Sequence, residues 1–273
     1  MTLTIPTPGR RVRVSSLDPA SFAPYGQVIQ NPATHSGLPS LASTDANRGT
    51  ARKYVAELES WYHLSRSQRR ARSVVNLIVH KPPTLEHGTT TVPVTVMERR
   101  PFTPQTFVPM AAEKETRYLV VVAPTLPLSS QRNTRDLHPA YPVNRPRRKR
   151  GVRERLLGAR PNPFTNDFSP STTPASPLAH AQTSPARPKG PGAPDLPQMQ
   201  AFVAWGDQGV TYGPGTWHAP VMPLGDKEIE FVVVQYENGV KVEDCQQLEI
   251  QSPDGCGVEV DVSGCSDAIR SKL

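Results

Sequence analysis

Hydrophobic and polar residues alternate over short stretches along much of this chain, and turn-forming residues separate the stretches. Alternation with a period of two is typical of β-strands that bury one face. The pattern predicts eleven or twelve short strands and almost no helix, which indicates an all-β barrel or sandwich. The predicted strands lie within residues 12–17, 27–30, 50–58, 74–80, 94–98, 105–110, 117–123, 199–205, 210–212, 216–224, 228–236 and 242–250.

Two of these stretches carry specific expectations. Residues 74–80 (VVNLIVH) are interpreted as a buried strand with one polar residue, Asn76, in its middle. Residues 117–123 (RYLVVVA) are almost entirely apolar, so that strand must be covered on both faces. Asp18, which is followed by proline, predicts the N-cap of a short helical turn. Residues 31–49 are rich in Asn, Ser, Gly and Pro and are interpreted as a loop.

The basic charge of the chain is concentrated in one segment. The 273 residues have a net charge of +7 from 31 Lys or Arg and 24 Asp or Glu; residues 129–197 hold 12 and 4 of these, which leaves 19 and 20 elsewhere. The same segment contains 13 of the 31 prolines and no apolar run. We therefore predict a long disordered Pro/Arg-rich insert at 129–197 within a single domain that spans 1–250, followed by a flexible tail at 251–273.

Short motifs indicate which partners to expect. Residues 145–155 (RPRRKRGVRER) have the density of a polyanion-binding or nuclear-localisation tract. No aromatic residue lies between these charges to stack on bases, so we interpret the tract as a solvated charge run and expect no nucleic-acid binding. No apolar run approaches the length that spans a bilayer, so we expect no membrane association. Ser271, Lys272 and Leu273 match the address read by the peroxisomal import receptor, which predicts a peroxisomal location, with the cytoplasm as the alternative.

Residues 201–220 (AFVAWGDQGVTYGPGTWHAP) contain two predicted strands and two turns. A Gly-Pro-Gly sequence fixes a tight reversal directly before Trp217 and His218. Neighbouring residues in a strand point to opposite faces. One of these two side chains is therefore expected to face into the protein and the other away from it.

Several polar residues interrupt otherwise apolar strands, and those that face inward in a barrel could line a ligand pocket. Such a pocket would combine a carboxylate, a guanidinium, an amide, a phenol and an imidazole, which suits a small anionic molecule. Glu98, Gln105 and His218 are the strongest candidates because each lies beside a proline or glycine turn. The interrupting residues are Asn76, His80, Glu98, Arg99, Gln105, Tyr212, His218, Gln235 and Glu237.

Several sequence blocks occur in the order seen in ureidoglycolate lyases, above all residues 98–110 (ERRPFTPQTFVPM) and 207–220 (DQGVTYGPGTWHAP). The chain resembles the fungal form of this family from about Val12 to Ile250, outside the insert. The resemblance implies a cupin-like β-barrel of the jelly-roll type and a homodimer. It also implies a carbon–nitrogen lyase of the amidine-lyase type that cleaves (S)-ureidoglycolate to glyoxylate and urea in allantoin and purine catabolism. The alternative is a non-enzymatic, cupin-like protein that binds small acids or polyanions.

The implied reaction is an elimination from a carbinolamine. A base removes the hydroxyl proton, a carbonyl forms, and the C–N bond breaks as the urea nitrogen is protonated. We expect His218 or Glu98 to be the base and Tyr212 or a water molecule to be the acid. Arg99 or Lys81 is expected to hold the substrate carboxylate through a charge-assisted pair.

The ureido group of the substrate needs paired donors and acceptors, for which we expect Gln105 and Asn76. Trp217 is expected to contribute to substrate binding. The reaction needs no redox cofactor. The cupin resemblance leaves open a divalent metal, nickel or manganese, with His218, Glu98 and Gln105 as its ligands, although the HxH spacing of cupins is absent.

Overall fold

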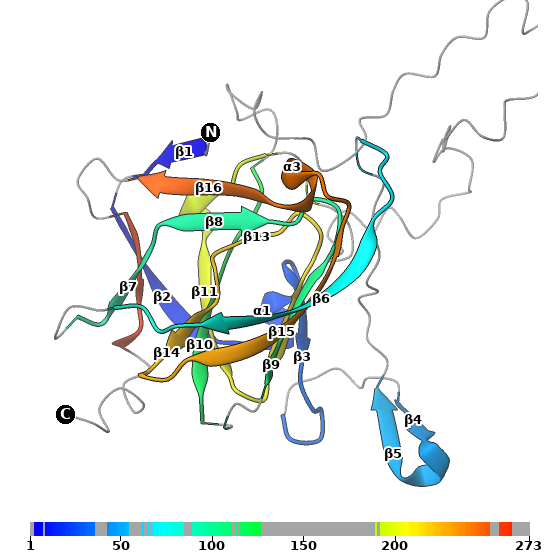
Figure 1. Cartoon of the computed structure of the whole chain (residues 1–273). Helices are drawn as coiled ribbons and strands as arrows, with labels where there is room; N and C mark the ends of the chain where they lie inside the picture. Colours follow the sequence, from blue (N-terminus) through cyan, green and yellow to red (C-terminus); the bar gives the residue numbers. More distant parts are fainter. Residues whose placement is uncertain are drawn as a thin grey trace, which may run out of the picture.

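The computed structural model of this chain is built almost entirely of β-strands (Figure 1). The described residues contain seventeen strands and only short helices, which confirms the prediction of an all-β, cupin-like fold. No helix among them is long and apolar enough to cross a membrane. The described residues are 3–7, 9–35, 43–54, 62, 65, 67–84, 89–110, 113, 115–126, 189, 192–251 and 257–263.

Ten strands form a large sheet that curls into a half-barrel (Figure 1). Its long strands are antiparallel or parallel to neighbours that are distant in sequence, as in jelly-roll folds. In spatial order the strands are β1 (Leu3–Pro6), β16 (Gln246–Gln251), β8 (Val96–Arg99), β13 (Trp217–His218), β10 (Arg117–Ala123), β11 (Gln200–Trp205), β2 (Arg10–Ser16), β17 (Val258–Asp261) and β7 (Thr91–Val94), with β14 (Met222–Leu224) also beside β10.

Five strands form a smaller sheet in the order β3 (Gly26–Ile29), β12 (Gly209–Tyr212), β9 (Gln105–Met110), β15 (Ile229–Glu237) and β6 (Arg72–His80). A separate hairpin stands apart from both sheets in Figure 1 and joins β4 (Ser43–Ala46) to β5 (Ala51–Tyr54) through the 3-10 turn η1 (Asn47–Gly49). The segment predicted as a loop, 31–49, therefore includes one short strand.

The helices are single turns at the ends of strands. Helix α1 (Pro19–Phe22) begins after Asp18, whose Oδ1 accepts hydrogen bonds from the backbone N–H groups of Ala20 and Ser21 at 2.9 and 3.1 Å, so the predicted N-cap is confirmed. The 3-10 helix η4 (Leu196–Gln198) precedes β11. Helix α3 (Lys241–Asp244) occupies the first part of the predicted strand 242–250, which therefore begins only at Gln246.

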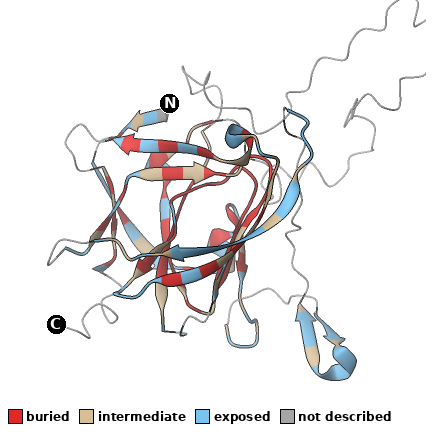
Figure 2. Cartoon of the chain, in the orientation of Figure 1, coloured by how far each residue is buried: buried red, intermediate tan, exposed pale blue. Residues whose placement is uncertain are grey.

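Strand β10 lies between two hydrophobic cores. Leu119 and Val121 pack in a core enclosed by the curled large sheet, whereas Tyr118 and Val120 pack against the smaller sheet. All four side chains are fully buried, which confirms that β10 is covered on both faces (Figure 2). The large sheet thus contributes side chains to the interior from both of its faces. Alternate residues of a strand such as β8 can therefore pack in a core on one face and line a polar site on the other.

Strand β6 is not buried, so the prediction for residues 74–80 is wrong. It lies at the edge of the smaller sheet, where β15 is its one paired neighbour among the described strands. Val75 and Leu77 are 67% and 59% exposed, and β6 is coloured as exposed along much of its length in Figure 2. Apolar composition indicated burial, but these side chains lie on the face of the smaller sheet that points away from the large sheet.

The predicted flexible tail at 251–273 contains a strand, β17. Its pairing with β2 and β7 extends the large sheet, and Val258, Val260 and Val262 are fully buried. The expectation of a flexible tail is therefore wrong for residues 257–263. The alternation of valine with acidic residues over 258–262 is a strand signal that was overlooked because the stretch is short.

The predicted insert also ends earlier than 197. The backbone carbonyl of Gly192 accepts hydrogen bonds from Arg99 and Trp217, and Leu196 packs in the core enclosed by the large sheet. Residues 192–197 are therefore part of the domain, whose interior they complete. Residues 129–188 of the predicted insert lie outside the described residues.

Replacing Val260 with Ala should lower the free energy of unfolding by roughly 2 kcal/mol, because a fully buried side chain is truncated without room for collapse. The matched control is Val242→Ala, because Val242 is 44% exposed and its truncation should change stability by less than about 0.5 kcal/mol. Urea denaturation measures both values. Equal stability of the two variants would contradict the place of β17 in the sheet.

Candidate active site

Glu98 and His218 lie directly opposite each other on the paired strands β8 and β13. The turn before β13 needs a glycine at position 215. The φ angle there is +76°, a backbone conformation that a residue with a side chain rarely adopts. The His218 Nε2 atom is 3.6 Å from Glu98 Oε1. Trp217 points to the opposite face from His218, as predicted, but neither side chain faces away from the protein, because both faces of the large sheet are covered there.

The hydrogen bonding of His218 fixes which nitrogen carries the proton. Its Nδ1 lies 2.9 Å from the backbone carbonyl of Thr216, which can only accept, so Nδ1 is the protonated nitrogen of the neutral ring. Nε2 is buried, has no hydrogen-bond partner among the described residues, and faces the carboxylate of Glu98. His218 can therefore accept a proton at Nε2 and share the resulting charge with Glu98.

Tyr212 stacks on the imidazole of His218 from the smaller sheet. The ring centroids are 4.0 Å apart and the planes differ by 8°. Burial, together with the nearby Tyr118 and Glu98, raises the pKa of Tyr212 well above its usual value, so the phenol stays protonated. Its hydroxyl is buried and has no hydrogen-bond partner within the described ranges. It is thus a hydrogen-bond donor beside His218.

Glu98 is ionised in spite of its burial. Burial by itself would raise the pKa of this carboxyl, but the adjacent His218 whenever it is protonated, the charge of Arg100 and the thiol of Cys245 together lower it below its usual value. The Cys245 Sγ atom lies 3.8 Å from Glu98 Oε2. Burial and the charge of Glu98 raise the pKa of Cys245 to about 11, so the sulfur is a neutral thiol at pH 7.

A chain of polar side chains runs from Gln105 to Arg100. Gln105 lies opposite Tyr212 on β9, and its amide nitrogen donates to Gln235 Oε1 at 2.8 Å. The amide nitrogen of Gln235 donates to Glu237 Oε1 at 2.6 Å, and this same oxygen lies 3.9 Å from Arg100 Nη1. We call this group of side chains the polar cluster: Glu98, Arg100, Gln105, Tyr212, His218, Gln235 and Glu237.

Four buried atoms of the polar cluster have no hydrogen-bond partner in the described part of the chain. Buried polar atoms in native proteins are nearly always hydrogen bonded, so several in one cluster indicate a site that a polar ligand completes. The side chains of Glu98, Arg100 and Glu237 are 21%, 16% and 32% exposed, which leaves one side of the cluster open to solvent. The four atoms are Arg100 Nε, Gln105 Oε1, Tyr212 OH and His218 Nε2.

Arg99 and Trp217 lie on the other face of the large sheet, so the structure does not support their predicted roles in substrate binding. The Nε and Nη2 atoms of Arg99 donate to Gln246 Oε1 at 2.9 and 2.7 Å, and its guanidinium lies 4.4 Å from the centre of the Trp217 ring. Burial lowers the pKa of Arg99 to about 9, which leaves the group charged at neutral pH and dependent on these acceptors. Arg99 and Trp217 are structural residues.

Asn76 and Lys81 are not brought into the polar cluster either. Asn76 is exposed on the edge strand β6, and Lys81 follows that strand with its side chain 79% exposed. Lys81 Nζ instead lies 3.6 Å from Glu228 Oε1. His80 is closer to the site, but its imidazole packs edge-on against Phe231, and burial lowers its pKa, which favours the neutral ring.

Arg100 is the guanidinium that lies in the polar cluster, although the sequence pattern favoured Arg99. Arg100 lies two residues after Glu98, so alternation directs it to the same side, whereas Arg99 points to the opposite side. Its Nη1 donates to the backbone carbonyl of Asp244 at 2.8 Å. Alternation from Glu98 could have identified Arg100, but two adjacent arginines at a strand end leave the choice ambiguous. Cys245 was also missed, because no spacing motif involves it.

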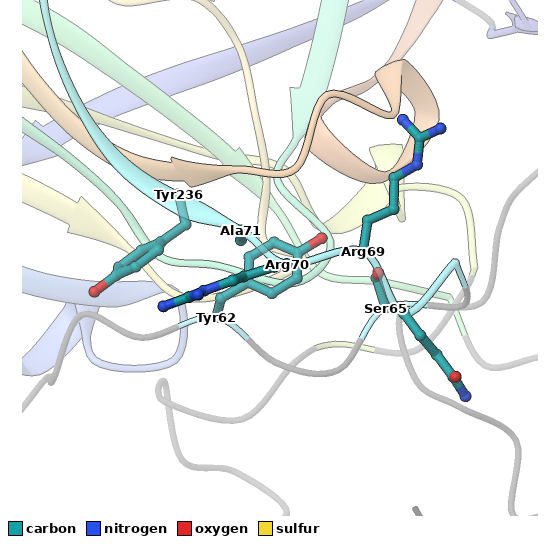
Figure 3. A pocket seen from close by; sticks show the side chains of 7 residues that line it. Tyr62, Ser65, Arg69, Arg70, Ala71 and Tyr236 are labelled. Carbon is teal, nitrogen blue, oxygen red and sulfur yellow. The ribbon is translucent and has the colours of Figure 1, made fainter.

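Two cavities share Arg70 and Ala71 in their linings, and one of them touches the polar cluster. One of about 500 Å³ is lined by Glu237, Arg70 and Arg72, and so borders the cluster through Glu237. The other, of about 240 Å³, includes Tyr62 and Tyr236; Figure 3 shows Arg70 along one side of it, while Arg69 extends in the opposite direction.

The proposed metal ligands meet only in part. Glu98 and His218 face each other, and Gln105 adds a buried amide oxygen. However, the described residues contain no group of three His, Cys, Asp or Glu side chains that could hold a metal ion. One imidazole, one carboxylate and one weak amide ligand are fewer strong donors than a resident divalent metal normally has. These residues do not fit such a metal, and the chemistry below involves only protein groups.

The fold is cupin-like, and the polar cluster combines a carboxylate, an imidazole and a phenol, which are groups suited to acid–base chemistry. A family model described as ureidoglycolate lyase matches residues 9–256. The chain is 31% identical over 252 residues to a ureidoglycolate lyase of Schizosaccharomyces pombe, which covers 89% of this chain and 94% of that protein. It is also 24% identical over 225 residues to a ureidoglycolate lyase of Burkholderia mallei, or 82% of each chain.

This chain belongs to the ureidoglycolate lyase family, and it is a lyase. A shorter match, 52% identical over 46 residues, is to a ureidoglycolate lyase of Saccharomyces cerevisiae and covers 16% of this chain and 24% of that one. The prediction of family and enzyme class is confirmed. The alternative of a non-enzymatic binding protein gains no support, and the basic tract 145–155 on which it partly rested lies outside the described residues.

Replacing Arg99 with Met should lower the free energy of unfolding by roughly 3 kcal/mol, because it removes a buried charged donor from the Gln246 amide oxygen. The control Arg100→Met should cost only about 1 kcal/mol, because Arg100 is partly exposed and a water molecule can replace it. Chemical denaturation of both variants measures the difference. Equal losses would contradict the assignment of Arg99 as the structural arginine.

Proposed function

We propose that this chain cleaves ureidoglycolate into glyoxylate and urea, with the polar cluster as its active site. The observation that carries the proposal is the convergence of four buried, unpartnered polar atoms beside an ionised carboxylate. Family membership supports the choice of substrate. Ureidoglycolate carries a carboxylate, a hydroxyl and a ureido group, and the cluster offers a cation, a base and an amide to match them.

His218 acts as the base in this proposal. Its Nε2 is unprotonated in the neutral ring and takes the proton of the substrate hydroxyl. The carbonyl of glyoxylate forms as the C–N bond breaks, and the departing urea nitrogen receives a proton from Tyr212, from a water molecule or back from His218. Glu98, 3.6 Å from Nε2, stabilises the imidazolium that forms during the reaction.

Arg100 takes the role of carboxylate anchor that was expected of Arg99 or Lys81. It follows β8 directly, its charge lowers the pKa of Glu98, and its Nε is buried without a hydrogen-bond partner in the described ranges. Pairing with the substrate carboxylate would give this guanidinium a charge-assisted hydrogen bond. The reaction then proceeds between a fixed carboxylate at Arg100 and a ureido group held at Gln105.

Replacing His218 with Ala and Glu98 with Gln should each lower kcat by about 10² or more, because the first removes the proton acceptor and the second the charge that stabilises it. Glyoxylate, urea and ammonia are measured separately after incubation with ureidoglycolate. The control is Val242→Ala, which lies outside the cluster and should retain normal turnover. Near-normal kcat in both site variants would contradict the assignment, and ammonia in place of urea would contradict the reaction.

We also propose that two copies of this chain form a homodimer through the outer face of the smaller sheet. On this face Leu77, Val232 and Val108 lie side by side on three adjacent strands. Leu77, Val108 and Met110 are 59%, 37% and 43% exposed, and β6 is an edge strand with a free side among the described strands. Exposed apolar side chains next to an open sheet edge are typical of an interface between subunits.

Replacing Leu77 with Asp should convert the dimer into a monomer, because a charge would be desolvated at the centre of the apolar surface. Sedimentation velocity measures the mass, and circular dichroism checks that the fold is retained. Val242→Asp changes an exposed valine on α3 in the same way and should leave the dimer intact. A Leu77→Asp protein that sediments with wild-type mass would exclude this face as the interface.

Two expectations stay predictions. One concerns the divalent metal that the cupin resemblance left open: because the side chains present do not fit it, activity should survive exhaustive chelation, and loss of activity would contradict this. The peroxisomal address is the other: Ser271, Lys272 and Leu273 lie outside the described residues. Import of a fluorescent fusion with and without these three residues tests whether they direct the protein to peroxisomes.

A further inference from the structure

Three side chains of the polar cluster form a hydrogen-bonded chain with a single possible direction. Glu237 Oε1 accepts from the amide nitrogen of Gln235 at 2.6 Å, and Gln235 Oε1 accepts from the amide nitrogen of Gln105 at 2.8 Å. Gln105 and Gln235 are each 2% exposed, so solvent does not compete for their amide groups. The chain runs from a partly exposed carboxylate to a buried amide across strands β15 and β9.

The carboxylate at the end of the chain sets this direction. An ionised carboxylate can only accept hydrogen bonds, so Gln235 must turn its NH₂ group toward Glu237 and its oxygen toward Gln105. Gln105 must then turn its NH₂ group toward Gln235. Reversing either amide would bring two oxygens or two NH₂ groups together in a buried site. The orientation of both amides thus follows from the chemistry of Glu237.

The consequence for the site is that Gln105 presents an acceptor. Its amide nitrogen is used by Gln235, so its Oε1 points to the site. This oxygen is buried without a hydrogen-bond partner among the described residues. Gln105 lies directly opposite Tyr212 on the neighbouring strand, and the Tyr212 ring stacks on the base. An acceptor at this place matches an N–H group of the substrate and not its carbonyl oxygen.

We propose that Glu237, acting through Gln235, fixes Gln105 as a hydrogen-bond acceptor for an N–H of the ureido group. Glu237 and Gln235 are then positioning residues that determine how the substrate is oriented. This inference rests on the proposed function of the polar cluster. It predicts that the urea carbonyl faces away from Gln105 and that its N–H group faces toward it.

The experiment compares steady-state kinetics with ureidoglycolate for the wild type and three variants. Glu237→Gln removes the group that can only accept, so the chain can reverse and Gln105 can present NH₂. Gln235→Leu breaks the chain but leaves Glu237 beside Arg100. Each should raise KM about tenfold with kcat changed less than about threefold, because the lost interaction is made equally in the ground and transition states.

The double variant Gln235→Glu with Glu237→Gln moves the carboxylate one position inward. A carboxylate at 235 again accepts from Gln105, so the orientation of Gln105 is restored, although the partner of Arg100 at 237 is no longer charged. KM should return to within about threefold of the wild-type value. Thermal unfolding of every variant verifies that the proteins compared are folded.

The outcomes separate this inference from the proposed function. If the wild type releases no glyoxylate and urea, the proposed function fails. If the wild type is active and Gln235→Leu leaves KM unchanged, the role of Gln105 orientation is overturned. A Glu237→Gln protein with raised KM that a folded double variant does not restore would also overturn it, because the effect would then arise from Arg100. Raised KM in both single variants with restoration in the double variant supports the inference.

Discussion

The contact between Tyr212 and His218 is the interaction on which the site depends. Tyr212 belongs to the smaller sheet and His218 to the large sheet, and their rings stack at 4.0 Å between centroids. Each sits in a strand whose register is fixed by neighbours: His218 opposite Glu98, and Tyr212 opposite Gln105. A slip of one residue in either strand would replace Tyr212 or His218 in the cluster by a neighbour from the opposite face. The packing of two sheets therefore determines the geometry of the chemistry.

Burial of the large sheet on both faces allows one strand to serve two purposes. On β8 and β13, Glu98 and His218 face the polar cluster, while their neighbours Arg99 and Trp217 face the core enclosed by the large sheet. The Arg99 guanidinium lies over the Trp217 ring, so the two residues stabilise each other on the far side of the same strand pair. The two sequence blocks thus alternate residues of the polar cluster with residues of the core.

The sequence alone predicted the all-β fold and the members of the site that interrupt apolar strands beside turns, namely Glu98, Gln105, Tyr212 and His218. The sequence did not show which of Arg99 and Arg100 faces the site. When both faces of a strand are buried, the hydropathy pattern does not alternate clearly and does not reveal the direction of each side chain. The same ambiguity explains β6: valine and leucine indicate burial, but only the sheet order reveals an edge strand with one face uncovered. Side-chain direction, and not residue type, was the missing information.

The unpartnered polar atoms of the cluster lower the free energy of unfolding. Hydrogen bonds from a ligand or from water would offset this loss. Each buried polar atom without a partner costs about 1 to 3 kcal/mol, and a domain of this kind is stable by only about 5 to 15 kcal/mol. Four such atoms in one place would be expensive if they served packing alone. Two fully buried cores around β10 supply the stability that tolerates them. A substrate that forms hydrogen bonds with all four atoms removes their desolvation penalty. This gain adds to the binding free energy, so a small polar molecule can bind tightly.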